Sequence, residues 1–556
     1  MMILNLFKSI SVNFLVSLLF LNASFSFGSL SKEDVKRAEK KPLNFSAICI
    51  DTIPVKVSPN DVVKLKAKGF VSYSDFGAKG DGKTDDINAI AATHEFANQQ
   101  RLIVKADDGA TYYISGKQQT VTIQTNTDFG SAAFIIDDTN VENRQSIVFE
   151  VTSKHQSFKI IGINSLKKNQ KKINVSFLRK SVVIVTNSNK KRYIRYGLNQ
   201  NNGHSQTDIF IADTKGNVDL NTPILWNFDT ITAFDVFPID EKVLKITGGN
   251  FITIANKHAS EYKYYQRNIL IKRSNVLIDG LKHVIVGEED QGAPYGGFLS
   301  IKDCANITVQ NTILTAHKTF HTIGSAGKPV SMGSYDIQVN RALNVLFFNC
   351  TQTNDIYDTT FWGIMASNHS KNLTYDSCVL SRFDAHMGVY NAEIRNSTIG
   401  YAGINLIGFG TFTLKNSKVY SNHLINLRRD YGSTWQGNFI ILDVVFVPFF
   451  PKENLGYHLF IGFNNGQHDF GYTCYMPKKI TIENLLIDDS KHPNEVYSNA
   501  IFDDFNPDFN SHFKERFPYI KTQKLVLKNV TTASGNTIKM SKNQYMFQKL
   551  KKRVLN

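Results

Sequence analysis

The sequence predicts an all-β fold, a solenoid of stacked strands called a parallel β-helix, with one helix that caps its N-terminal end. Three observations predict it. A nine-residue phrase recurs through the second half of the chain, its shortest spacing is about 20 residues, and 40 Phe and 22 Tyr stand against only 13 Pro. Aromatic residues favour strands and proline disfavours them. At 556 residues, such a chain is a repetitive body or several domains.

Residues 1–28 are predicted to be a secretory signal peptide. Lys8 precedes an apolar stretch over residues 12–21, and small residues follow it. The apolar stretch is shorter than the roughly 20 residues that a membrane-spanning helix needs. We therefore expect a secreted or periplasmic protein with no stable membrane insertion after signal removal, and an N-terminal extension over residues 29–70.

Residues 71–116 combine a turn rich in Gly and Asp with a helix and two strands. The turn, "DFGAKGDGKTDD", spans residues 75–86, and a helix is expected to begin near Thr84 or Asp85. "LIVKADDGATYYISG" then reads as two short strands around a turn. An uncapped solenoid end exposes unpaired strands, so we expect this module to cover the first turn of the solenoid. We predict that the aspartates of the turn are structural and not catalytic.

This module resembles the N-terminal cap of the pectate-lyase-like superfamily of right-handed parallel β-helix proteins, in particular the rhamnogalacturonase/epimerase-type pectate lyase domain. The resemblance is carried by "DFGAKGDGKTDD", the Ala-rich helix after it and the "TYYISG" strand. That superfamily includes polysaccharide lyases, polygalacturonase-like hydrolases, epimerases and phage tailspikes. The resemblance implies a right-handed solenoid that acts on carbohydrate. "KADDGATYY" departs from the family pattern, which usually has a proline before the strand.

Residues 117–274 contain short strands without a clean repeat. "SIVFEV", "SVVIVT", "DIFIAD" and "VLKITGG" each end in turn signals. Two interpretations stay open for this region, namely early irregular turns of the solenoid with insertions, or an inserted β subdomain.

Residues 275–535 carry the regular turns. In each copy of the repeat the second and fourth residues are mostly apolar and the sixth is usually Asn, Asp, Gly or Ser, which predicts strand, bend, strand. The copies begin at Asn275, Asn306, Asn344, Asn372, Asn391, Thr411, Asn438, Lys479 and Lys524. Variable spacing above a minimum is typical of a β-helix, because its loops grow without disturbing the stacked strands. Residues 536–556 are predicted to be a basic, solvated tail.

Stacking of the copies predicts ladders of equivalent side chains. Bend asparagines are expected to bond one another through their amides, at Asn311, Asn349, Asn396, Asn416, Asn484 and Asn529. Cys350 and Cys378 follow the bend by one residue, and we expect them to stack in the core.

Polar and aromatic residues gather in the segments 353–371, 381–391, 401–410 and 420–437, which successive turns would stack into one patch. Arg382, Asp384 and His386 share a face if their segment is a strand, because alternate side chains point the same way. An Asp beside a His orients it as a general base, and an Arg binds a carboxylate in bidentate fashion. Tyr390 lies in the same segment and is the candidate residue that donates a proton.

These residues suit β-elimination on a uronate polymer, in which a base removes the proton α to a carboxylate and an acid protonates the departing oxygen. Candidate substrate-binding residues are Trp362, Arg428, Tyr431 and Trp435, with core packing as the alternative for each aromatic ring. Hydrolysis by paired carboxylates stays open, with Asp355, Asp358 and Asp384 as candidates. A non-catalytic glycan-binding protein is the third alternative.

The net charge of +15 and the pI near 9.3 point to an anionic partner. We expect an anionic polysaccharide and not nucleic acid, and a monomer. The five cysteines form no CxxC pair, which removes the usual signature of zinc and redox sites. No cofactor is predicted, although "DFNPDFNSHFKE" at residues 504–515 leaves calcium open, with Phe509 where an EF-hand loop needs Gly.

Overall fold

The computed structural model describes residues 56–324, 326–449, 456–492, 497–506, 512–543 and 545–555. All of them belong to one compact unit, Ile48–Asn556. The predicted signal peptide, Cys49 and most of the predicted N-terminal extension lie outside the described residues. No helix in the described part of the chain is long and apolar enough to cross a membrane.

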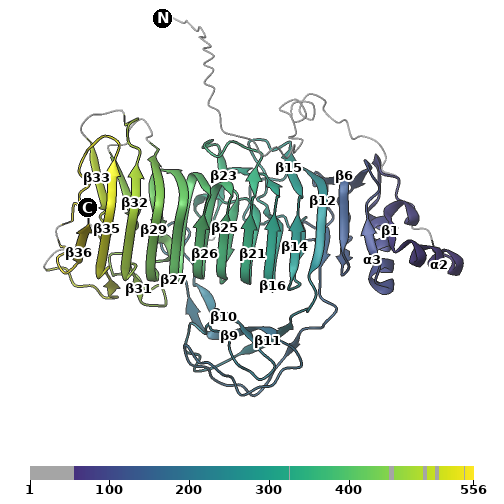
Figure 1. The fold of residues 1–556 in the computed structure, drawn as a ribbon, viewed down its shortest axis with the longest axis horizontal. Coiled ribbons are helices and arrows are strands. Elements are labelled where there is room, and N and C mark those ends of the chain that lie inside the picture. Colours follow the sequence, from purple (N-terminus) through teal and green to yellow (C-terminus); the bar gives the residue numbers. More distant parts are fainter. Residues whose placement is uncertain are drawn as a thin grey trace, which may run out of the picture. The chain divides into compact units, whose positions relative to one another are not determined.

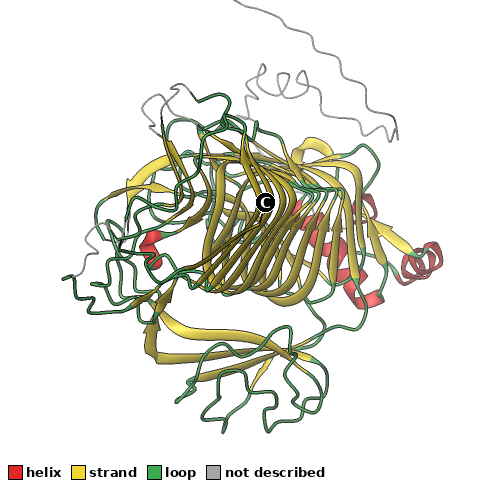
Figure 2. Ribbon diagram, turned by 60° about the vertical axis from the view of Figure 1, so that its left-hand side comes forward, coloured by secondary structure: helices red, strands yellow, loops and turns green. Residues whose placement is uncertain are grey.

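The described chain forms a right-handed parallel β-helix, which confirms the predicted fold class (Figure 1). One sheet of 26 strands winds through the molecule, and each strand pairs in parallel with a strand of the next turn. β16 and β21, for example, stay in register from Gly296↔Tyr335 to Gln310↔Phe348. Figure 2 shows the turns stacked behind one another around a common interior. That interior is a continuous apolar core in which Cys350 and Cys378 are buried, as predicted.

The strands of this sheet lie in the following order. Those before the insertion are β1 (Phe70–Ser72), β2 (Asp81–Asp85), β3 (Ile103–Lys105), β4 (Thr111–Ile114), β5 (Val121–Ile123), β6 (Thr127–Asp137) and β7 (Phe149–Val151). Those of the middle turns are β12 (Leu244–Ile254), β13 (Ile269–Ile271), β14 (Val276–Asp279), β15 (Lys282–Val286), β16 (Gly296–Gln310), β17 (Ile313–Leu314), β21 (Tyr335–Phe348), β22 (Thr351–Gln352), β24 (Met365–Asn368), β25 (Lys371–Asp376), β26 (Val379–Arg395) and β27 (Thr398–Ser421). Those of the last turns are β28 (His423–Leu427), β29 (Trp435–Pro448), β30 (Gly456–Ile461), β32 (Lys479–Ile487), β33 (Ser498–Phe502), β35 (Lys524–Thr532) and β36 (Lys551–Leu555).

Short strand pairs in the loops complete the secondary structure. They are β18 (His317–Lys318) with β23 (Phe361–Gly363), β19 (Phe320–Ile323) with β20 (Pro329–Met332), and β31 (Cys474–Tyr475) with β34 (Tyr519–Ile520). The helices are α2 (Pro59–Lys68), α3 (Ile87–Gln100) and two 3-10 turns, η1 (Tyr73–Phe76) and η2 (Arg429–Tyr431).

The N-terminal cap is α3, which buries Ile87, Ile90 and Ala97 against the first turns. It begins later than predicted, because β2 extends to Asp85 and pairs with β4. The aspartates of the turn serve the backbone. Asp86 accepts hydrogen bonds from the N–H groups of residues 79 and 80 at 2.8 and 3.0 Å, and Asp81 accepts from residues 83 and 84. Their role is therefore structural.

Residues 158–238 form a second, antiparallel sheet of β8 (Phe158–Lys159), β9 (Ser181–Arg192), β10 (His204–Ala212) and β11 (Ala233–Pro238). The chain leaves the solenoid after β7 and returns to it at β12, so the region between residues 117 and 274 holds both early turns and an inserted sheet (Figure 1). Ile184 and Ile209 of the insertion pack on Leu343 of the solenoid. A buried ion pair joins the inserted sheet to the solenoid, with Asp208 and Lys371 2.8 Å apart.

Asparagines at the bends form two ladders along the solenoid, each residue with a positive φ. The predicted ladder exists: Asn349 donates to Asn311 at 2.7 Å and Asn529 donates to Asn484 at 3.0 Å. Where the preceding turn has no asparagine at its bend, an aspartate accepts the amide hydrogen bond, as Asp279, Asp376 and Asp443 do. The second ladder runs through Asn275, Asn306, Asn344, Asn372 and Asn391.

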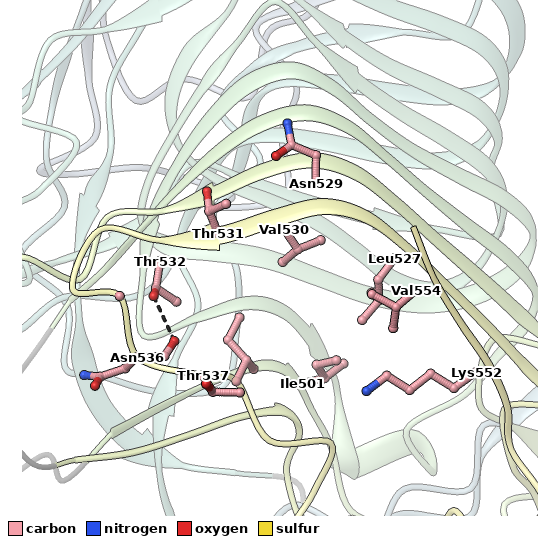
Figure 3. A pocket seen from close by; sticks show the side chains of 12 residues that line it. Ile501, Leu527, Asn529, Val530, Thr531, Thr532, Asn536, Thr537, Lys552 and Val554 are labelled. Atoms are coloured by element: carbon pink, nitrogen blue, oxygen red, sulfur yellow. Dashed lines mark hydrogen bonds between the residues drawn. The ribbon is translucent and has the colours of Figure 1, made fainter. Parts of the chain in front are cut away.

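The C-terminal segment differs from the solvated tail expected for residues 536–556. Residues 551–555 form β36, which pairs with residues 524–528 of β35. Residues 529–532 of β35 have no strand on their outer side within the described part of the chain. A cavity of about 580 Å³ lies there, and Figure 3 shows Ile501, Leu527 and Val554 around it.

Candidate functional site

Five charged side chains from distant parts of the chain form one network, the arginine-aspartate cluster. Arg382 and Asp384 lie on β26, Arg428 and Asp430 at η2, and Arg195 after β9. Asp384 Oδ2 accepts from Arg382 Nη2 at 2.7 Å and from Arg428 Nη1 at 3.2 Å. Asp430 accepts two hydrogen bonds from Arg428, at 2.9 and 3.2 Å, and one from Arg195 Nη2 at 2.8 Å. Three guanidinium groups meet two carboxylates, so the network has an excess positive charge.

Local structure places these groups. Arg382 and Asp384 point the same way because they alternate on one strand, as the sequence predicted. η2 ends at Gly432, whose φ of 83° is left-handed, and this tight turn folds Asp430 back onto Arg428. Arg195 reaches the cluster because the chain after β9 is held to η2, where the Tyr196 N–H donates to the Asp430 carbonyl at 2.9 Å.

The charges of the cluster are stable. Burial alone would raise the pKa of Asp430, but the Arg428 guanidinium outweighs burial and holds that pKa well below its usual range. Burial would lower the pKa of Arg428, but Asp430 and Asp384 outweigh it and raise that pKa above its usual value. Arg428 and Asp430 keep 15% and 17% of their side-chain surface exposed, so solvent reaches the cluster.

Aromatic rings surround the cluster. The Arg382 guanidinium lies 5.0 Å from the centre of the Trp362 ring, and that of Arg195 lies 5.4 Å from the Tyr431 ring. A Cβ atom on Gly333 would collide with the Tyr335 hydroxyl and with Trp362 Nε1, so these two side chains meet over that glycine. The site therefore combines cations with flat apolar faces.

Four buried polar atoms at the cluster have no hydrogen-bond partner in the described part of the chain. They are Arg195 Nε, Arg382 Nε, Asp384 Oδ1 and Trp362 Nε1. Buried polar groups in folded proteins are nearly always paired with protein, water or ligand. Their concentration in one place indicates a site that holds polar partners from outside the chain.

His386 lies beside the cluster and is half-buried. Its Nδ1 is 2.8 Å from Asn368 Oδ1, and its ring packs edge-on against Tyr431 at 5.3 Å. Because a carbonyl oxygen only accepts, Nδ1 carries the proton and Nε2 keeps its lone pair. Burial, followed by the Arg428 charge, lowers the pKa of His386 to about 3, so the ring is neutral at physiological pH. Asn368 orients this imidazole, in the position where we expected Asp384.

The other predicted residues are dispersed. Tyr390 packs over Gly410, and no hydrogen bond joins it to the cluster among the described residues. Asp355 and Asp358 occupy a loop, where Asp355 Oδ1 accepts from the Tyr357 N–H at 2.9 Å and Asp358 Oδ1 from the Thr360 N–H at 2.8 Å.

Trp435 corrects a prediction. It is fully buried in the solenoid core, and its Nε1 donates to the Gly410 carbonyl at 2.9 Å. A ring without exposed surface offers no platform for a sugar, so core packing, the alternative that we left open, is its role. The same holds for Tyr431, which is 2% exposed and packs in a buried cluster with Tyr193 and Met387.

Three residues of the site were missed from the sequence, namely Arg195, Asn368 and Tyr335. The signal for Arg195 was the run "NKKRYIR", which we interpreted only as part of the dispersed positive charge. No sequence signal marks Asn368 or Tyr335, since both depend on the stacking of neighbouring turns.

A second polar group, the histidine-carboxylate cluster, lies in the middle turns and consists of His283, Glu288, His317 and Asp336. Asp336 Oδ1 is 2.7 Å from His283 Nδ1 and 3.4 Å from His317 Nε2, and Glu288 Oε1 is 3.0 Å from His317 Nδ1. All four side chains are at least 93% buried. Burial lowers the pKa of His317, but Glu288 and Asp336 outweigh burial and raise it to about 9. His317 is therefore an imidazolium between two carboxylates.

Metal ligands are not grouped in the described residues. Among them, no set of three or more His, Cys, Asp or Glu side chains is arranged to hold a metal ion. The segment 504–515 lies partly outside the described residues, so calcium binding there stays an open alternative.

The fold and the cluster define a right-handed β-helix with a cationic, aromatic-lined site. No family model matches the sequence. A capsule-specific depolymerase of a Klebsiella phage is 31% identical over 128 residues, which is 19% of this chain and 12% of that protein. The chain therefore matches only a small part of that relative.

Solved phage tailspikes resemble the fold. The tailspike gp61 of Pseudomonas phage phi297 has a TM-score of 0.51 at 12% identity, over 87% of this chain and 84% of that one. The Gp54 tailspike of Acinetobacter baumannii bacteriophage AP22, solved in complex with a capsular saccharide, has a TM-score of 0.49 at 9% identity, over 88% of this chain and 80% of that one. At these identities the likeness concerns the fold alone.

Proposed function

We propose that the protein binds an anionic, uronate-containing polysaccharide at the arginine-aspartate cluster and cleaves it by β-elimination. The observation that carries this proposal is the set of unpaired buried polar atoms, Arg382 Nε, Arg195 Nε and Trp362 Nε1, beside a surplus of positive charge. A uronate offers the carboxylate that guanidinium groups bind best and the apolar ring face that stacks on indole. The capsule-specific depolymerase relative and the resemblance of residues 71–116 to the rhamnogalacturonase/epimerase-type domain agree with a polysaccharide as the substrate. The signal peptide predicted for residues 1–28 makes export part of the proposal.

The orientation of His386 supports elimination as the reaction, because its bond to Asn368 Oδ1 holds the proton on Nδ1 and leaves the Nε2 lone pair to act as the base. Its Nε2 lone pair takes the proton from the carbon next to the uronate carboxylate, and the C–H electrons form a double bond to the neighbouring ring carbon. The bond from that carbon to the glycosidic oxygen breaks, and the oxygen takes a proton. Tyr335 is the candidate donor, because it is only partly buried, its hydroxyl lies beside Trp362 Nε1, and burial raises its pKa above the usual value and keeps it protonated. Arg382 neutralises the carboxylate and so makes the proton removable.

Hydrolysis by two carboxylates has less support. Asp384 is fully buried and paired with two arginines, so it is a poor nucleophile or base. Asp355 and Asp358 hold the backbone of their own loop and make no bond to the cluster in the described part of the chain.

The test is incubation of the purified protein with polygalacturonate, alginate and neutral dextran, following the ultraviolet absorbance of unsaturated uronate together with reducing ends. His386→Ala is expected to lower the rate by roughly 10²–10⁴-fold, the usual contribution of a general base. The matched control is His321→Ala, an exposed histidine on β19. Reducing ends without absorbance would overturn elimination, and binding without either product would leave a glycan-binding protein.

A further inference from the structure

A row of aromatic side chains leads from the arginine-aspartate cluster toward the earlier turns of the solenoid. This aromatic row consists, in order from the cluster, of Trp362, Tyr335, Tyr264 and Tyr262. The Trp362 ring lies 5.0 Å from the Arg382 guanidinium, and Trp362 meets the Tyr335 hydroxyl over Gly333. The rings of Tyr335 and Tyr264 are nearly parallel, at 13°, with their centres 6.4 Å apart. Tyr262 follows edge-on at 6.1 Å, so the row is continuous with the cluster.

The aromatic row crosses several turns of the solenoid. Tyr262 and Tyr264 precede β13, Tyr335 begins β21, Trp362 lies on β23 just before β24, and Arg382 lies on β26. β13 pairs with β16, β16 with β21, β21 with β24, and β24 with β26. At the spacing of paired strands, these four steps give a length of about 19 Å along the solenoid axis. A single sugar ring does not fill this length, whereas a polysaccharide chain does.

Solvent reaches all four rings of the row. Tyr262 is 42% exposed, and Tyr264, Tyr335 and Trp362 are each partly exposed. Single exposed apolar residues are common on protein surfaces, but a contiguous set beside a polar site marks a binding surface. Aromatic rings with a polar tip suit a partner that is apolar on one face and hydroxylated at its rim, as a sugar ring is.

The charges at both ends of the aromatic row suit an anionic chain. Tyr262 stands between Glu261 and Lys263 in the sequence. The Glu261 carboxylate lies 3.2 Å from Arg144 and 3.4 Å from Lys263, so one negative charge meets two positive charges there. At the other end, the arginine-aspartate cluster has three guanidinium groups against two carboxylates. An anionic polymer on the row therefore meets an excess of positive charge at each end.

We propose that the aromatic row is a set of subsites for the sugar residues next to the uronate at the cluster, so that the polysaccharide lies along the solenoid axis. This inference rests on the proposed function, because it assumes that a uronate occupies the cluster. It adds a direction for the bound chain and a requirement for chain length. Stacking needs only the apolar face of a sugar, so the row selects for length and not for the charge of the flanking residues.

The test measures Kd by calorimetry for disaccharides and hexasaccharides of galacturonate and of mannuronate. All variants carry His386→Ala, which slows cleavage during the titration. Tyr262→Ala is expected to raise Kd for the preferred hexasaccharide about three- to tenfold, as loss of a stacking ring does, and Kd for the disaccharide by no more than about twofold. Phe348→Ala, an exposed phenylalanine at a bend of β21, is the matched control and should change neither.

Tyr262→Phe is the sharper variant, because it keeps the ring and removes only the hydroxyl. It should bind the hexasaccharide as tightly as the protein with Tyr262, and a loss as large as that of Tyr262→Ala would overturn stacking on the row. Equal Kd values for disaccharide and hexasaccharide would also overturn the row and leave the proposed function intact. Failure of every uronate oligosaccharide to bind would instead overturn the proposed function, and this inference with it.

Discussion

The two polar clusters of the solenoid differ in whether their hydrogen bonds are complete. In the histidine-carboxylate cluster, both nitrogens of each histidine and both oxygens of Asp336 have partners, including Thr253 and Thr315. In the arginine-aspartate cluster, four buried polar atoms have none within the described residues. The first is also sealed from solvent, while the second is partly exposed.

This difference separates stability from function. A complete buried network rigidifies the core, and removal of one member leaves the others unpaired. In an incomplete network, unpaired buried polar atoms destabilise the free protein. A ligand that pairs with these atoms supplies the missing hydrogen bonds when it binds. We therefore expect substitutions in the first cluster to change the free energy of unfolding, and substitutions in the second to change glycan binding.

Asp336→Ala should have the largest effect. It leaves the charged ring of His317 buried beside one carboxylate and strips His283 and the Thr315 N–H of their acceptor. The free energy of unfolding should fall by about 3–5 kcal/mol, measured by urea denaturation. Asp336→Asn keeps an acceptor and should lose less. If Asp336→Ala lowered the free energy of unfolding less than Asp336→Asn, the result would contradict the stabilising role of this cluster.

Stability should also fall at alkaline pH because of His317. Its pKa is about 9 in the folded protein and about 6.5 in an unfolded chain. The stabilisation is fully present below about pH 6.5 and is lost as the pH rises through about 9, for a total of about 3 kcal/mol. Melting curves across this window should show the loss, and His317→Gln should abolish it. Glycan binding by the other cluster should stay flat there, since His386 titrates at about 3.

Arg382→Met tests whether the arginine-aspartate cluster binds glycan. Asp384 keeps its bond from Arg428, so the free energy of unfolding should fall less than in Asp336→Ala. Affinity for polygalacturonate should fall roughly tenfold to hundredfold, as for a lost hydrogen bond to a charged group. Arg395→Met is the matched control, because Arg395 lies on the same strand and pairs with Asp376 and Glu393 at the bend. Equal losses in the two variants would indicate general electrostatic attraction in place of a defined site.

Much of the fold was predictable because its determinants repeat along the chain. The bend asparagines recur at a fixed phase, and the structure joins Asn349 to Asn311 as that phase requires. Strand alternation likewise placed Arg382 beside Asp384. Both inferences need only the local period and the stacking distance.

The rest of the site depends on contacts between different turns, and the sequence alone does not show which residues of two turns lie side by side. Arg195 meets Asp430 across 235 residues, through an insertion that no repeat announces. The register between β24 and β26 shifts beside Asn368, which brings this amide and not Asp384 to His386. Trp435 pairs in register with Gly408, and only the close packing of that pair shows that the indole fills the interior.

Trp362→Phe is the mildest change and the most specific one. The indole N–H has no partner in the described part of the chain, so its removal takes no hydrogen bond from the fold. Phe keeps a ring under Arg382, and the free energy of unfolding should therefore stay unchanged. If a glycan hydroxyl accepts from Nε1, Kd should rise about two- to tenfold. Unchanged affinity would mean that Nε1 donates to ordered water and not to the glycan. Unpaired buried atoms would then no longer be evidence that this cluster is a binding site.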